Sequence, residues 1–94
     1  MREKTLIKII NKIIPEARPV PLTEFYDDDS YEGIYTEGIW FKGSEDIAKD
    51  EISIFDCYLD NETGGVHPKL DQILEEANWY WEPYDSGTLM AYKN

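Results

Sequence analysis

The sequence contains very few of the residue types from which disulfides, metal centres and nucleophilic sites are built. Its 94 residues include one cysteine, Cys57, and one histidine, His67. A single cysteine cannot form an internal disulfide bond, so a reducing, cytoplasmic setting is the default expectation. One cysteine and one histidine also do not supply the three or four ligands at defined spacing that a zinc site requires. We therefore predict a protein without a metal site or a cofactor.

Long apolar runs are missing as well. Charged residues are interspersed from Arg2 to Lys12, and the apolar runs between them are only two residues long. A signal peptide or a membrane-spanning helix needs a much longer apolar stretch. The sequence therefore predicts no membrane partner.

Basic residues are scarce relative to acidic ones. Nine Lys and Arg residues stand against 20 Asp and Glu residues, which gives a formal net charge of −11. Residues 21–62 contain thirteen acids and two bases, so this middle part holds essentially all of the excess negative charge. A field of this sign repels nucleic acid and attracts basic protein surfaces or cations. We therefore expect no direct nucleic-acid binding, and a basic protein surface as the partner.

The remaining composition is sufficient for one folded domain, residues 1–94. Hydrophobic residues make up 41% of the chain and aromatic residues 14%. A chain of this size buries roughly two-thirds of the surface that its unfolded form exposes. One core can therefore form without disulfide or metal cross-links, and there is no room for a second domain.

The stretch from His67 to Tyr92 carries the clearest structural signals. Pro68 can open a helix, an apolar stripe continues it, and Asn78 can close it. Residues 79–84 and 88–92 are typical of two strands, with a turn between them. In the first strand the tryptophans face one way and the tyrosines the other, because side chains alternate along a strand.

The rest of the fold is predicted from periodicity and from proline and glycine. Residues 3–14 have the spacing of an amphipathic helix that ends before Pro15, whereas the prolines in residues 15–37 indicate an irregular connection. Strands are predicted near residues 38–43 and at 52–58, the latter in the sheet interior because both of its faces are apolar. The predicted class is α+β, in the order α-β-β-α-β-β. Its four-stranded sheet is mostly antiparallel, with both helices packed on one face.

Cys57 and His67 are of the right types for nucleophilic catalysis. However, Cys57 is predicted in the middle of a strand, on the same side as Phe55 and Leu59, and a thiol buried among apolar groups is inert. His67 directly precedes Pro68, so we expect it to be the residue at which a helix begins. We therefore predict no catalytic residues, and a protein that is not an enzyme.

Two groups of residues are candidates for binding a partner. The first is an acidic run with interleaved aromatics, which is either a solvated loop or a fixed array of carboxylates. The second is the outward-facing tyrosines of residues 79–84, which either anchor a partner or belong to a two-sided core. The candidate residues are Asp27, Asp28, Asp29, Glu32, Glu37, Tyr80 and Tyr84.

The C-terminal third also carries a resemblance. Residues 65–70 (GVHPKL), 79–88 (WYWEPYDSGT) and 90–92 (MAY) resemble a pattern of small acidic proteins from bacteriophages and mobile elements. The resemblance implies an intracellular bacterial setting and favours an inhibitor of a host defence system. Some inhibitors of that kind present carboxylates at phosphate-like spacing and occupy a nucleic-acid site.

Our leading hypothesis is a non-enzymatic acidic interaction protein that binds a basic partner protein, as an inhibitor or polyanion mimic. The alternative is a small-molecule-binding or enzymatic α+β domain with an aromatic pocket formed by Trp40, Tyr80, Tyr84 and Tyr92. A third interpretation is that the acidic residues serve only solubility. An exposed sheet face would also favour a homodimer through the sheet.

Overall fold

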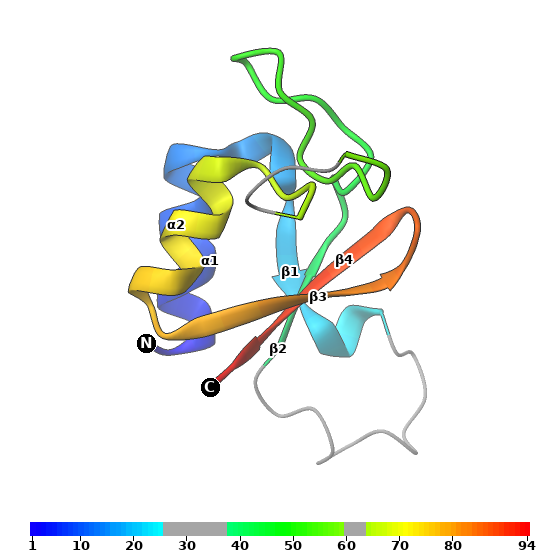
Figure 1. The fold of residues 1–94 in the computed structure, drawn as a ribbon. Coiled ribbons are helices and arrows are strands. Elements are labelled where there is room, and N and C mark those ends of the chain that lie inside the picture. The colour runs from blue at the N-terminus through cyan, green and yellow to red at the C-terminus, as the bar shows by residue number, and fades with distance from the viewer. Residues whose placement is uncertain (26–37, 60–63) are drawn as a thin grey trace.

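The four strands pair in an antiparallel sheet whose spatial order differs from the chain order. The computed structural model describes residues 1–25, 38–59 and 64–94 (Figure 1), and its sheet has the order β1-β2-β4-β3. The strands are β1 (Pro19–Pro21), β2 (Gly38–Phe41), β3 (Trp79–Asp85) and β4 (Thr88–Lys93). The helices are α1 (Glu3–Ile13) and α2 (Pro68–Glu76), and two short 3-10 helices are η1 (Pro15–Ala17) and η2 (Leu22–Glu24). The predicted α+β class and the order α-β-β-α-β-β are confirmed, although the first of the two strands before α2 is β1 and the segment 52–58 is not a strand.

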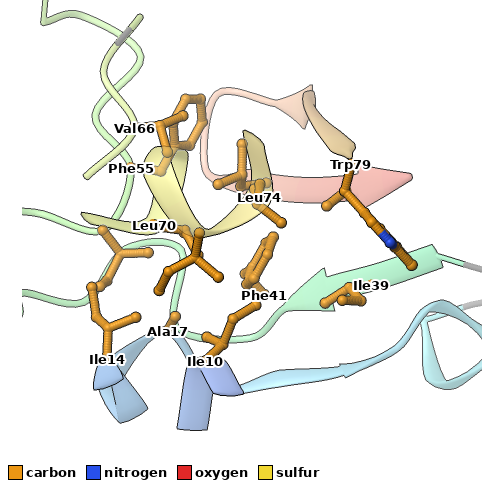
Figure 2. Close-up of a cluster of buried hydrophobic side chains, with 14 of the residues drawn as sticks. Ile10, Ile14, Ala17, Ile39, Phe41, Phe55, Val66, Leu70, Leu74 and Trp79 are labelled. Carbon is orange, nitrogen blue, oxygen red and sulfur yellow. The ribbon is translucent and has the colours of Figure 1, made fainter. Parts of the chain in front are cut away.

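Both α-helices lie on the same side of the sheet, as predicted (Figure 1). The inward side chains of α1 and α2 include Ile10, Leu70 and Leu74, each at most 1% exposed. Figure 2 shows these side chains gathered around Phe41 of β2. Burying an aliphatic or aromatic side chain of this size contributes about 1.5–3 kcal/mol. This packing compensates for the modest helix propensity of α1, which is rich in β-branched isoleucine.

Helix α2 begins and ends at the residues that the sequence indicates. His67 is its N-cap, and His67 Nδ1 accepts a hydrogen bond from the Lys69 N–H at 3.0 Å. Pro68 follows at the first helical position, where a missing N–H costs nothing. After the helix, Asn78 has a φ of 63°, a left-handed conformation that commonly terminates helices. The chain then enters β3 directly, so β3 packs beside α2.

The strand register gives the sheet two different faces. On the helix side, Ile39 lies opposite Ala91 and Phe41 opposite Leu89, and all four side chains are fully buried. On the outer side, Trp40 lies opposite Met90, and Tyr80 lies opposite Tyr92. The predicted alternation in β3 is confirmed, because Trp79 and Trp81 pack with the core whereas Tyr80 points outward and contacts Tyr92.

The prediction of a strand at residues 52–58 is wrong. This segment makes only isolated bridges, Ile47 with Ser53 and Phe55 with Val66, and it belongs to no strand of the sheet. The chain turns away after Phe55, where Asp56 Oδ1 accepts a hydrogen bond from the Tyr58 N–H at 3.0 Å. Such Asp-centred turns end extended structure, which explains the one acid in an otherwise apolar alternation.

The strand that completes the sheet is β1, inside the stretch predicted to be an irregular connection. Pro19 and Pro21 lie opposite Phe41 and Ile39, with Val20 between them. The Lys42 N–H donates to the Arg18 carbonyl at 3.1 Å, and hydrogen-bonded pairs alternate along an antiparallel ladder. Val20 is therefore in a bonded position and the two prolines are not. An edge strand tolerates proline at positions where the missing N–H would not have bonded to the neighbouring strand.

None of the described helices is long and apolar enough to cross a membrane.

Candidate functional site

Helix α2 and strand β3 form a continuous surface that carries carboxylates and aromatic rings. The two elements are tied together by a hydrogen bond from Trp81 Nε1 to Asp71 Oδ1 at 2.8 Å. Lys69 lies in the first turn of α2, but residues 70–88, which cover the rest of α2, β3 and the following turn, contain no Lys, Arg or His. They contain five acids, which are Asp71, Glu75, Glu76, Glu82 and Asp85. We call residues 70–88 the α2–β3 surface, and the charged side chains of these residues are all acidic.

A hollow of about 250 Å³ lies between α2 and β3. Its lining combines two carboxylates with an apolar and aromatic wall. The lining residues are Asp71, Leu74, Glu75, Trp79, Tyr80 and Trp81. Asp71 and Glu75 are four positions apart in the helix, so they lie on the same helix face. Negative charge and aromatic surface are thus brought together at one place.

The outer face of β3 presents tyrosines beside an acid. Tyr80 is 43% exposed and Tyr84 is 54% exposed, with the exposed Glu82 between them in sequence. One side of each ring rests on another aromatic group, because the Tyr80 ring lies 5.6 Å from that of Tyr92 and the Tyr84 ring lies 4.8 Å from that of Phe25. The tyrosines are thus supported from within and open to solvent.

Phe25 also packs edge-on against Trp40, with ring centroids 5.1 Å apart. Lys42 follows directly after β2, and its ammonium lies 5.7 Å from the Trp40 ring centroid. The rings predicted to line a pocket therefore pack against one another and against a cation. Of these four rings, only Tyr80 lines the hollow between α2 and β3, and none of them lines the hollow beside His67.

The structure describes only part of the predicted partner-binding set. Tyr80 and Tyr84 lie on the outer face of β3, as expected. The predicted acids Asp27, Asp28, Asp29, Glu32 and Glu37 lie outside the described residues. The carboxylates of α2 were not predicted as site residues. The signal that could have identified them is the absence of any base from residues 70–88.

Several described acids of the middle part have structural partners. Asp46 forms an ion pair with Arg18 at 2.7 Å, and both side chains are about half exposed. Asp56 accepts the Tyr58 N–H within its turn, and Asp50 contacts His67. Exposed ion pairs of this kind contribute at most about 1 kcal/mol. These acids therefore hold local structure as well as contributing to the negative field.

His67 and Asp50 form a second polar constellation. His67 Nε2 lies 2.8 and 3.1 Å from the two carboxylate oxygens of Asp50, and His67 is 4% exposed. Because Nδ1 accepts from the Lys69 N–H, Nε2 carries the ring proton and donates it to Asp50. Partial desolvation raises the pKa of Asp50. The hydrogen bonds from the Ile52 N–H and from His67 outweigh it and hold that pKa below its ordinary value.

This pair does not have the arrangement of a catalytic dyad. A general base needs a ring nitrogen directed at the proton that it removes. Both nitrogens of His67 are already engaged, one by Asp50 and one by the helix backbone. A hollow of about 270 Å³ lies beside His67, lined also by Lys49 and Lys69. The prediction that His67 begins a helix is confirmed, and the pair fixes the start of α2.

The prediction that Cys57 is buried in a strand is wrong. Cys57 is exposed, in the turn that follows Asp56. The turn carries the thiol away from the core, on which Phe55 packs. Within the described ranges, no group of three His, Cys, Asp or Glu side chains could hold a metal ion.

Comparison with protein-family models, with curated proteins and with solved structures finds no match to this chain. The arrangement of its residues is therefore the basis for a functional conclusion.

Proposed function

We propose that the protein is a non-enzymatic binding protein that engages a basic partner protein through the α2–β3 surface. One observation carries the proposal: residues 70–88, which follow Lys69 in the first turn of α2 and continue through β3, hold five carboxylates and two exposed tyrosines and no basic residue. A surface of this composition complements a surface rich in arginine and lysine. Such complementarity steers encounter and selects against acidic partners.

The tyrosines would contribute to the affinity by burying apolar ring area against the partner, in addition to the attraction between opposite charges. Tyrosine is among the residues that dominate binding energy in protein interfaces, because its ring buries a large area while its hydroxyl remains polar. Tyr80 and Tyr84 project from a seven-residue strand and rest on Tyr92 and Phe25. Rings supported in this way lose little conformational entropy on binding.

A non-enzymatic role in the cytoplasm is part of the same proposal. The engagement of both His67 nitrogens removes the only histidine from general-base chemistry. The exposed, unpaired Cys57 suits a reducing compartment. Imitation of a nucleic acid, or inhibition of a protein that binds one, extends the proposal. The thirteen acids of residues 21–62 motivate that extension.

The test is recovery of a basic partner from bacterial lysate at low salt, with tagged protein as bait. Binding should be lost near 0.5 M salt, where the Debye length falls to about 4 Å. The double variant Tyr80→Ala/Tyr84→Ala should lose the partner. The matched control is Tyr58→Ala, because Tyr58 is 89% exposed but lies in the turn after Asp56. A salt-indifferent partner, no partner, or equal loss in the control would contradict the proposal.

A further inference from the structure

We propose that the hollow between α2 and β3 receives the guanidinium group of an arginine side chain. This inference rests on the proposed function, because the arginine would belong to the basic partner. The occupant follows from charge complementarity. The charged side chains of the lining are the carboxylates Asp71 and Glu75, and the other wall residues are Leu74 and three aromatic residues. Such a lining attracts a cation and repels an anion.

The size of the hollow indicates a side chain rather than a cofactor. Its volume is about 250 Å³, below the roughly 300–1,000 Å³ of sites that hold drug-sized ligands. Leu74 is 1% exposed and Trp79 is 3% exposed, so the apolar wall is backed by the core. A slender group with an apolar stem and a charged tip fits such a site.

The carboxylates are arranged for a forked donor. Asp71 Oδ1 accepts from Trp81 Nε1, and the described hydrogen bonds of this carboxylate involve only that oxygen. That bond fixes the carboxylate beside the Trp81 indole. Glu75 follows one helical turn later and is exposed. Guanidinium is planar, carries five donors and stacks on aromatic rings, whereas an ammonium is a compact point charge. Two carboxylates beside an indole therefore favour arginine over lysine.

The strand register directs one backbone acceptor of β3 toward the edge of the sheet. The Leu89 N–H donates to Ser44 Oγ on the β2 side, so the pair of Leu89 with Pro83 is not hydrogen-bonded in the β3–β4 ladder. Bonded and non-bonded pairs alternate, so Trp81, two positions before Pro83, is also in a non-bonded pair. Its carbonyl thus points away from β4, toward the sheet edge that β3 forms. Trp81 therefore lines the hollow, and its carbonyl is directed to the neighbouring sheet edge.

The experiment is an NMR titration of the full, 15N-labelled chain with the capped peptide acetyl-Gly-Arg-Gly-amide at constant ionic strength. The three tryptophans give three indole N–H signals. The signal of Trp81, which donates to Asp71, should shift and saturate. The signal of Trp40 should stay in place, because Trp40 lies on the outer face against Phe25. The analogous lysine peptide should bind several-fold more weakly.

Glu75→Gln should weaken arginine binding about tenfold, which corresponds to about 1.4 kcal/mol. The matched control is Glu76→Gln, which makes the same charge change at the next, exposed residue outside the hollow. Both acids are on the surface, so both variants should keep the wild-type spectrum in the absence of peptide. An unmoved Trp81 signal, equal weakening by the two variants, or equal affinity for the lysine peptide would overturn the inference.

The titration needs no partner protein, so it separates this inference from the proposed function. If a recovered partner binds Glu75→Gln as tightly as wild type and the peptide shifts nothing, the arginine site is wrong and the binding function stands. If the peptide binds as expected but lysate yields no partner, the hollow accepts arginine and the binding function is wrong.

Discussion

His67 Nε2 lies 2.8 Å from Asp50 Oδ2, and this contact joins two segments that are 17 positions apart in sequence. The same ring caps α2 through Nδ1. One buried side chain therefore fixes both the start of the helix and the loop that carries Asp50. The pair also fixes the tautomer of the ring, since only Nε2 has a proton to donate.

We expect His67→Ala to destabilise the protein by about 2–3 kcal/mol. The change removes the N-cap, which is worth about 1 kcal/mol, and also leaves a gap at a position that is 4% exposed. His67→Asn should cost about 1 kcal/mol less, because asparagine caps helices well although it is too short to reach Asp50. Urea denaturation of the three proteins measures the difference. Equal losses in the two variants would show that the cap contributes nothing.

The lowered pKa of Asp50 predicts an acid-dependent loss of stability. Desolvation opposes the shift, but the hydrogen bonds from the Ile52 N–H and His67 favour the charged carboxylate in the folded state. The resulting stability is present above the unfolded carboxyl pKa, about 3.9, and is lost as pH falls through the lower folded pKa. The free energy of unfolding of Asp50→Asn should therefore be lower than that of wild type at pH 6, and the difference should shrink as pH falls to 3. If urea denaturation gave the same difference in free energy of unfolding at every pH, the pKa of Asp50 would not be lowered in the folded state.

The sequence was sufficient to predict the elements whose local signals agree with their packing. Helix α2 has a capping residue, a proline at its first position and an asparagine after its end, and all three lie where expected. In β3, alternation placed Trp79 and Tyr80 on opposite faces, and the structure has Trp79 in the core and Tyr80 outside. Local signals of this kind fix a register, because one face of the strand must be buried.

The sheet membership of weaker segments could not be predicted, because it depends on partners that are distant in sequence. Residues 52–58 alternate like a strand, but Ser53 and Phe55 make single bridges to two different segments, at Ile47 and Val66. Pro19 and Pro21 look like loop residues, yet β2 accepts them as an edge strand. The hollow between α2 and β3 was missed for the same reason, since it exists only after the helix packs on the strand.

The exposure of Cys57 makes a direct test of the corrected assignment. The thiol lies in a turn and is exposed, so it should react with a disulfide reagent in native buffer as fast as in the unfolded chain, within about an order of magnitude. Cys57→Ser should change the free energy of unfolding by no more than about 0.5 kcal/mol, as is usual for surface substitutions. If the thiol reacts only after urea unfolds the protein, Cys57 is buried and its assignment to an exposed turn is wrong.

The hydroxyl of buried Ser44 bridges the end of β2 to β4, and we expect its removal to lower the free energy of unfolding. It is 2% exposed, its hydroxyl donates to the Phe41 carbonyl, and its oxygen accepts the Leu89 N–H at 2.9 Å. Ser44→Ala leaves both backbone groups without that partner, and an unsatisfied buried group costs about 1–3 kcal/mol. Ser86→Ala is the matched control, because Ser86 is exposed in the turn between β3 and β4. Thermal and urea unfolding should show a loss of about 2 kcal/mol for the first variant and less than about 0.5 kcal/mol for the second. Comparable stability of the two variants would mean that the strands are held without the hydroxyl bridge.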